Sequence, residues 1–165
     1  MMEIRPIEMK DIESFLNLLA SLDSSGFGGF SGDGILSVSN TENLFSNVLQ
    51  DPRKQILIAL DEEEITGYMS LFGNNVDMTK HRANVSLGIK DVANQNRIGK
   101  DLLNAGIKWA GNNDIYRLEL SLPVNRTSMI ELYKTLGFLT EGERIDSLYM
   151  EGEYINELYL YRLIN

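Results

Sequence analysis

A polar segment between an apolar strand and an amphipathic helix is the part of the sequence best suited to hold an anionic ligand. It reads Asn94-Gln95-Asn96-Arg97-Ile98-Gly99 and follows an apolar strand that ends near residue 89. We expect the helix, which runs through Trp109, to begin at Ile98 or Gly99. Amide groups at the start of a helix lack an acceptor within it, and together with the helix dipole they bind phosphate groups. The alternative is an ordinary turn without a ligand, because one glycine before a helix is a weak signal.

A second group with chemical potential is the phenol of Tyr133, in the run Leu132-Tyr133-Lys134-Thr135-Leu136-Gly137-Phe138. A phenol with a pKa of about 10 is protonated at neutral pH and can donate a proton to a leaving group. The alternative is that Tyr133 packs with Leu132 and Leu136 on the buried face of its helix.

The composition excludes several kinds of site. The chain of 165 residues has no cysteine and one histidine, His81. It therefore offers no disulfide, no thiolate metal site and no cysteine nucleophile, and one histidine cannot build a zinc site unaided. We expect no metal, and we expect His81 to lie in a loop before a strand.

The net charge of −9 bears on the choice of partner. It disfavours nucleic acid, because the fifteen lysines and arginines are scattered rather than gathered on one face. A cationic amine fits an acidic protein better, although acidity also serves solubility alone. No apolar run reaches the length of a membrane span, and the N-terminus lacks a signal core. We expect a soluble, cytoplasmic protein that does not bind membranes.

The periodicity of the apolar residues predicts one α/β domain over residues 1–165. A helix with a core-facing stripe is expected at 12–22, and another at 41–49, capped by Asn40 or Thr41. Residues 24–40 hold five glycines with Phe27 and Phe30. This segment reads as a loop, either a lid over a substrate or a connection whose rings cover the core. Strands are expected at 4–7, 55–60, 65–72, 84–89 and 118–122, and the second and third of them form a hairpin.

This order of elements resembles the GCN5-related N-acetyltransferase (GNAT) family. The resemblance covers nearly the whole chain: Met2-Glu3-Ile4-Arg5-Pro6 looks like the opening strand of the family. The sequence from Glu151 through Leu158 looks like the closing hairpin of its polyamine-type and ribosomal-protein-type members. The resemblance implies a mixed, twisted sheet of about seven strands with helices on both faces. It also implies a splay at the fourth strand, near Ile89.

The resemblance further implies that acetyl-coenzyme A is the cofactor. In such a fold the strand ending in Leu87-Gly88-Ile89 offers backbone groups to the pantetheine arm, and the segment from Asn94 to Lys100 receives the pyrophosphate. The chain departs from the family pattern in this segment, where of Asn94, Arg97 and Gly99 only Gly99 agrees. The implied cofactor residues are Leu87, Gly88, Ile89, Asn94, Gln95, Asn96, Arg97, Ile98, Gly99, Lys100, Asn125 and Arg126.

Arg97 either obstructs the approach of a phosphate to the backbone or turns outward to pair with it. Arg126 stands where family members commonly carry asparagine. The nearest asparagine, Asn125, is as easily read as a helix cap, as is Thr127.

By the same resemblance, Tyr133 stands at the position of the general acid. An amine attacks the thioester, amide groups near Ile89 hold the oxyanion, and the phenol protonates the departing thiolate. Family members place a basic glutamate at one of two positions, which here are Ser86 and Ser121. Glu119 could act through water, or water alone could remove the proton.

The predicted function is acetyl transfer to a primary amine, either a small amine or polyamine or a protein N-terminus. The closing hairpin is rich in carboxylates, which either dock a cationic amine or are simply solvated. The alternative function is a noncatalytic binding module on the same fold, in which Arg97 has displaced the cofactor. An exposed edge strand in the closing hairpin is compatible with a homodimer.

Overall fold

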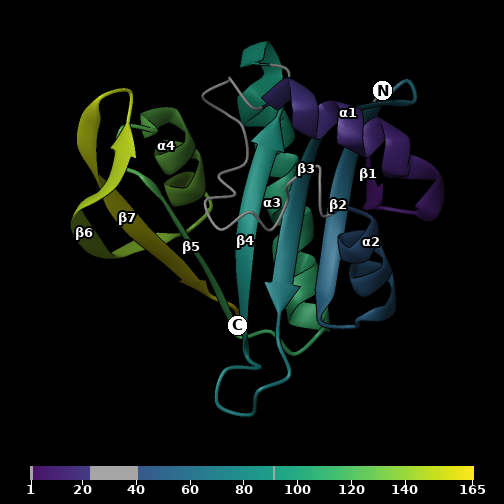
Figure 1. Ribbon diagram of the computed structural model, residues 1–165. Coiled ribbons are helices and arrows are strands. Elements are labelled where there is room, and N and C mark those ends of the chain that lie inside the picture. The colour runs from purple at the N-terminus through teal and green to yellow at the C-terminus, as the bar shows by residue number, and fades with distance from the viewer. Residues whose placement is uncertain (1, 23–40, 91) are drawn as a thin grey trace.

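The protein is built on a single mixed sheet (Figure 1). The structure, a computed structural model, is described for residues 2–22, 41–90 and 92–165. The candidate lid at 24–40 and the predicted cap Asn40 lie outside these residues. Within the described residues the sheet has seven strands in the order β1-β2-β3-β4-β5-β7-β6. They are β1 (Met2–Pro6), β2 (Lys54–Asp61), β3 (Glu64–Gly73), β4 (Arg82–Ile89), β5 (Arg117–Pro123), β6 (Leu139–Met150) and β7 (Glu153–Leu163).

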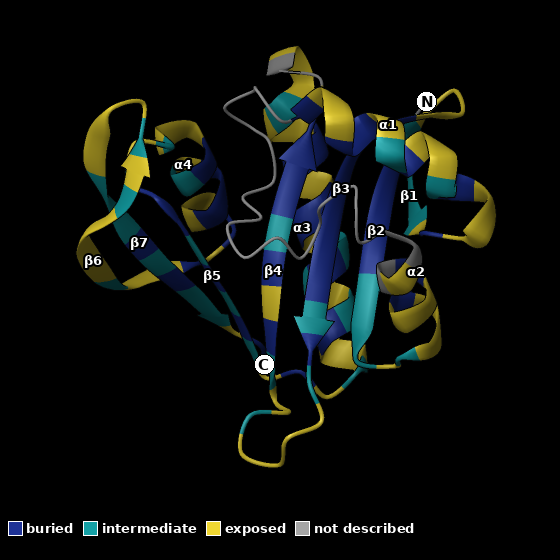
Figure 2. Ribbon diagram, viewed as in Figure 1, coloured by how far each residue is buried: buried dark blue, intermediate teal, exposed yellow. Residues whose placement is uncertain are grey.

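Two pairs of helices cover the two faces of the sheet, which confirms the predicted fold class. The helices α1 (Ile12–Leu22) and α2 (Thr41–Gln50) pack on one face. The helices α3 (Gln95–Asn112) and α4 (Thr127–Thr135) pack on the other. Figure 2 shows the central strands buried between them, while the outer surfaces of the helices are exposed. Short 3-10 turns precede α1 (Met9–Asp11) and α3 (Val92–Asn94).

The first helix is amphipathic at the spacing that the sequence predicts. Its buried residues, Phe15, Leu18, Leu19 and Leu22, recur every three or four positions and so share one face. The ring of Phe15 meets those of Phe45 in α2 and Tyr68 in β3 edge to face, at 5.6 and 5.3 Å between centroids. These contacts fix α1 and α2 against the sheet.

The sheet splits between β4 and β5, the one parallel pair in the described sheet. The two strands pair only over Arg82–Arg117, Ala83–Leu118 and Asn84–Glu119, and Figure 1 shows them diverging beyond that point. The splay at the fourth strand is therefore confirmed. It begins at Val85, earlier along the strand than Ile89. From Val85 to Ile89, β4 keeps its pairing with β3, but among the described residues it has no strand partner on the side of β5.

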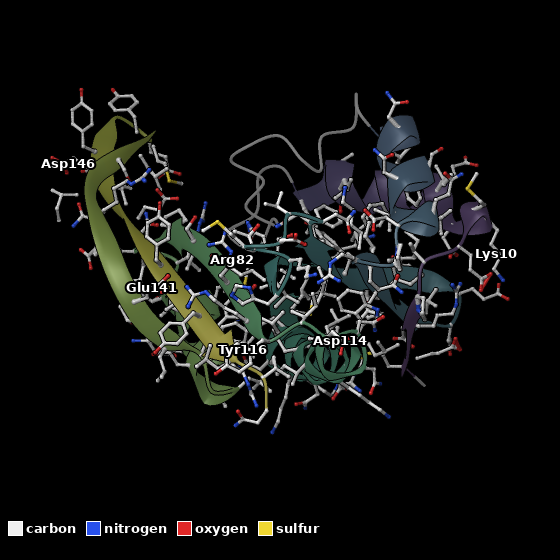
Figure 3. All side chains as sticks on the ribbon, turned by 90° about the horizontal axis from the view of Figure 1, so that it is seen from below. Lys10, Arg82, Asp114, Tyr116, Glu141 and Asp146 are labelled. Carbon is white, nitrogen blue, oxygen red and sulfur yellow. The ribbon has the colours of Figure 1, made fainter. Side chains whose placement is uncertain are left out.

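The closing hairpin forms one end of the sheet. β7 lies beside β5, which leaves β6 at the edge, and the pairing of β6 with β7 shifts register twice. Figure 3 shows Asp146 of this hairpin at one extremity of the molecule and Lys10 near the opposite one. No helix in the described part of the chain is both long and apolar enough to span a bilayer.

Candidate active site

A cleft lies where β4 and β5 separate, and it contains about 360 Å³ of space, part of it open to solvent. Three elements build its wall: β4, β5 and α4. The lining residues are Val85, Ser86, Leu87, Leu120, Ser121, Leu122, Pro123, Arg126, Met129 and Tyr133. The structure thus brings together three predicted site residues: Leu87 of β4, Tyr133 of α4, and Arg126, which directly precedes α4.

Tyr133 belongs both to the core and to the wall of the cleft. Its side chain is only 2% exposed, and its ring meets that of Phe138 edge to face at 5.1 Å. Burial raises the pKa of the phenol above its ordinary value, and the neighbouring Tyr68 adds to the effect. The phenol therefore keeps its proton at every physiological pH. The packing role and the predicted chemical role are compatible with one another.

Ser86 is the hydroxyl-bearing residue on the β4 side of the cleft lining, and it contacts two hydroxyl groups of β3. The Ser86 hydroxyl lies 2.5 Å from that of Ser70 in β3. Burial raises the pKa of Tyr68 to about 12, against the opposing effect of a hydrogen bond with Ser86. Gly88 makes room for this tyrosine, since a Cβ there would lie 2.4 Å from Cε1 of Tyr68. Gly88 thus has a packing role in addition to the predicted backbone contact.

The predicted start of the third helix was wrong. The helix α3 begins at Gln95, directly after the 3-10 turn, rather than at Ile98 or Gly99. The amide groups that lack helical acceptors therefore belong to earlier residues. Ile98 and Gly99 are buried, and a Cβ on Gly99 would lie 2.4 Å from Cδ2 of Leu132. Gly99 thus allows α3 to approach α4 closely.

The other residues of the segment predicted to bind the pyrophosphate, Asn94 to Lys100, differ in exposure. Asn94, Asn96, Arg97 and Lys100 are exposed around the first turns of α3. Gln95 is half-buried, and within the described residues its side-chain Oε1 is buried without a hydrogen-bond partner. Arg97 and Lys100 place positive charge beside the helix start, where an anion would bind.

The two residues predicted at the start of α4 are placed differently. Arg126 precedes the first turn of α4 and is half-buried in the cleft wall. Asn125 is exposed and is not part of that wall. The alternative reading of Asn125 or Thr127 as the helix cap does not hold, because Arg126 occupies the N-cap position and makes no side-chain cap hydrogen bond.

The structure also separates the candidate bases. Glu119 is engaged by arginines, with Oε1 3.1 Å from Nε of Arg82 and Oε2 3.9 Å from Nε of Arg117. Ser121, in the cleft wall, donates a hydrogen bond to Oε2 of Glu157 at 2.7 Å. From the sequence, Glu157 is only one of the several carboxylates of the closing hairpin. Its position beside the cleft follows from the pairing of β5 with β7, which no local pattern reveals.

No group of three or more metal-binding side chains occurs in the described residues. The cleft and the start of α3 instead present an unpaired strand edge, a helix N-terminus and two exposed cations. An extended arm ending in phosphates fits such a surface, because a strand edge pairs with extended groups and a helix start with anions.

The comparisons with known proteins agree with this geometry. Residues 4–159 match the sequence model described as an acetyltransferase (GNAT) domain. Among curated proteins no relative matches. A GNAT-family acetyltransferase from Streptococcus pneumoniae is 25% identical, with a TM-score of 0.87 over the whole of both chains.

Two further solved structures share the fold at lower identity. One is ribosomal-protein-alanine N-acetyltransferase from Brucella melitensis, with 19% identity and a TM-score of 0.81 over 98% of this chain and 99% of that one. The other is a phosphinothricin acetyltransferase from Sinorhizobium meliloti in complex with acetyl-coenzyme A. It has 17% identity and a TM-score of 0.83 over 99% of this chain and 89% of that one. With a family match that spans nearly all of its sequence, the chain belongs to the GNAT acetyltransferases.

Proposed function

We propose that the protein transfers an acetyl group from acetyl-coenzyme A to a primary amine by direct attack. The observation that carries the proposal is the cleft at the β4–β5 splay, with Tyr133 in its wall. The acceptor is a small amine, a polyamine or a protein N-terminus.

The chain offers a separate surface to each part of the cofactor. The free edge of β4 from Val85 through Leu87, Gly88 and Ile89 supplies backbone groups for an extended arm. The first turn of α3, from Asn94 through Arg97 and on to Lys100, supplies amide groups and cations for phosphates. Because Arg97 is exposed, its side chain does not fill the cleft. The exposure of Arg97 therefore favours a side chain that turns outward and pairs with a phosphate. It disfavours a side chain that obstructs the approach of the phosphate to the backbone.

Tyr133 supplies the proton that the departing thiolate requires. The burial that raises the pKa of the phenol would also make a thiolate in the same cleft more basic, because both anions lose water. The proton can therefore pass to sulfur even though the phenol is a weak acid. Arg126, in the same wall, places positive charge near the developing negative charge.

Acceptor choice is the least constrained part of the proposal. The relatives include proteins described as acting on ribosomal-protein alanine and on phosphinothricin. A test panel therefore contains spermidine, a peptide with N-terminal alanine, and phosphinothricin. Release of free thiol from acetyl-coenzyme A reports turnover with any of them.

Binding and turnover together test the function. Acetyl-coenzyme A at a hundred times its dissociation constant should stabilise the protein by about 2.7 kcal/mol, visible as a rise in melting temperature. At least one panel amine should then accelerate thiol release. If the protein shows neither stabilisation by acetyl-coenzyme A nor thiol release, the noncatalytic binding module is favoured instead.

We also infer that residues 1–165 form one folding domain and that two copies associate through the edge strand β6. Two observations support the association: the edge of β6 that no other described strand pairs with, and the exposed hairpin side chains Ile145, Tyr149 and Tyr154. Light scattering after gel filtration should give twice the mass of the chain. A monomer at micromolar concentration would contradict the association.

A further inference from the structure

We propose that Ser121 and Glu157 together form the proton acceptor for the amine, an inference that rests on the proposed acetyl transfer. The sequence alone does not reveal this pair, because Ser121 lies on β5 and Glu157 on β7, far apart along the chain. The hydrogen bond from the Ser121 hydroxyl to Oε2 of Glu157, at 2.7 Å, joins them.

The position of Ser121 connects the carboxylate to the cleft. Its side chain lies in the wall that also contains Tyr133 and Arg126. Because its O–H group is directed at Glu157, the lone pairs of its oxygen remain available to an N–H group in the cleft. The Ser121 hydroxyl would then connect an amine held in the cleft to the carboxylate of Glu157.

Glu157 is held in place from two sides. Its Oε2 accepts the bond from Ser121, and its Oε1 lies 3.3 Å from the Ser147 hydroxyl and 3.5 Å from the Tyr159 hydroxyl. The residue is half-buried. A carboxylate fixed by neutral hydroxyl donors keeps its ability to accept a proton in one defined direction.

The neighbouring carboxylates make other contacts, with arginines or with an asparagine side chain. Both oxygens of Glu119 face arginines, at 3.1 and 3.9 Å. Glu141 lies 2.6 Å from Nη2 of Arg117, and Oε2 of Glu143 accepts a bond from the Asn156 amide at 2.6 Å. Among the described residues, no ion pair engages Glu157.

Charged and titratable groups surround the pair on each packed element. On β6, Arg144 pairs in register with Glu157, but its guanidinium lies over the Tyr159 ring at 5.5 Å from the centroid. β6 also carries the carboxylates Glu141, Glu143 and Asp146, and Tyr159 lies on β7 itself. On α4, Arg126 and Tyr133 face the cleft. One cation of β6, Arg144, and one at the start of α4, Arg126, thus belong to the elements packed around the pair.

An ammonium group has no lone pair, so one proton passes to the Ser121 oxygen while the Ser121 proton passes to Glu157. The neutral nitrogen then forms the C–N bond, and the C–S bond breaks with its electron pair on sulfur. Tyr133 protonates the thiolate and regains a proton from the new amide nitrogen. Glu157 releases its proton to solvent, so one proton is released for each ammonium acetylated.

The variants that test the pair are Glu157→Gln, Ser121→Ala and the double variant. The control is Glu153→Gln, which removes the same charge from the same strand at its exposed start. kcat/KM is measured from pH 6 to pH 9.5 with the panel amine that the wild type turns over fastest. Acetyl-coenzyme A stabilisation of each variant is measured alongside and should match the wild type.

The expected result is a change in the shape of the pH profile. With the pair intact, kcat/KM should stay nearly level over the pH range in which the amine is an ammonium ion. In Glu157→Gln it should fall about 100-fold or more at pH 7, and the deficit should shrink about tenfold per pH unit as neutral amine accumulates. Ser121→Ala should behave in the same way, and the double variant should lose little more. Glu153→Gln should stay within about threefold of the wild type.

Two results would overturn the inference while leaving the acetyltransferase function intact. One is a Glu157→Gln profile parallel to that of the wild type, which would mean a structural role. The other is full activity in Ser121→Ala, which would mean that the hydroxyl carries no proton. A wild type that binds acetyl-coenzyme A but acetylates no panel amine would contradict the proposed function and, with it, this inference.

Discussion

Tyr133 is packed in the core, and it is also the residue for which we propose a role as proton donor. Its ring is packed against Phe138, and its side chain is still part of the cleft wall. The run around Tyr133 predicts the position of the phenol. The elevated pKa could not be predicted from it, because it arises from burial by residues distant in sequence, Tyr68 among them.

Replacing Tyr133 by phenylalanine should separate the two roles. The ring stays, so the free energy of unfolding should change by less than about 1.5 kcal/mol. The proton donor is lost, so kcat should fall by about 100-fold or more while acetyl-coenzyme A still binds. Steady-state thiol release and thermal unfolding measure the two effects. An unchanged kcat would remove Tyr133 from the chemistry.

The ion pair of Arg5 with Asp11 is a residue-scale contribution to stability. Nη1 and Nη2 of Arg5 donate to Asp11 at 2.8 and 2.9 Å, and the amide of Glu8 donates to it at 2.8 Å. These bonds, that of Arg5 foremost, hold the pKa of Asp11 below its usual value. The folded state therefore binds the proton more weakly than the unfolded state, and stability falls as the carboxylate is protonated.

An Asp11→Asn variant should lose about 2 kcal/mol of unfolding free energy near neutral pH. The contribution is complete above the unfolded pKa of about 3.8 and is lost as the pH falls below it. Urea unfolding of both proteins between pH 6 and pH 3 should therefore show the difference shrinking toward the acid end. A difference that stays constant with pH would show that the charge of Asp11 is irrelevant.

At the scale of elements, the periodicity of apolar residues predicts most of the fold. The stripe of α1 and the hairpin of β2 with β3 appear as expected. The prediction of where α3 begins was wrong, because the start of the helix depends on a 3-10 turn that no apolar pattern marks. The onset of the splay and the pairing of Ser121 with Glu157 depend on contacts between distant strands, which a local window cannot contain.

Two glycines provide a matched test of how the cleft is packed. A Cβ on Gly88 would lie 2.4 Å from the ring of Tyr68, and one on Gly106 would lie 2.4 Å from Sδ of Met69. The ring is rigid and confined, whereas a methionine side chain rotates easily. Gly88→Ala should therefore cost about 1–3 kcal/mol and reduce acetyl-coenzyme A binding.

Gly106→Ala should be close to neutral, since alanine gains about 1 kcal/mol of helix propensity over glycine. Chemical denaturation of the two variants gives the comparison. Equal losses would show that Tyr68 yields as easily as Met69, and that Gly88 has no special packing role.

At the scale of the molecule, the net charge of −9 should act on the approach of the substrate. Attraction between an acidic protein and a cationic amine is screened by salt over a Debye length of about 10 Å at 0.1 M. For spermidine, kcat/KM should fall as ionic strength rises, while kcat stays nearly constant. Phosphinothricin, which carries acidic groups, is the control and should not show this fall. Equal salt dependence for both amines would contradict steering.

The central claim is that the cleft between β4 and β5 receives acetyl-coenzyme A. A crystal structure of the protein with this thioester tests it most directly. The pantetheine arm should lie beside β4 from Val85 to Ile89. The pyrophosphate should lie at the first turn of α3, and the thioester sulfur within hydrogen-bond reach of Tyr133. A thioester bound elsewhere, or a cleft closed by Arg97 or Arg126, would contradict it.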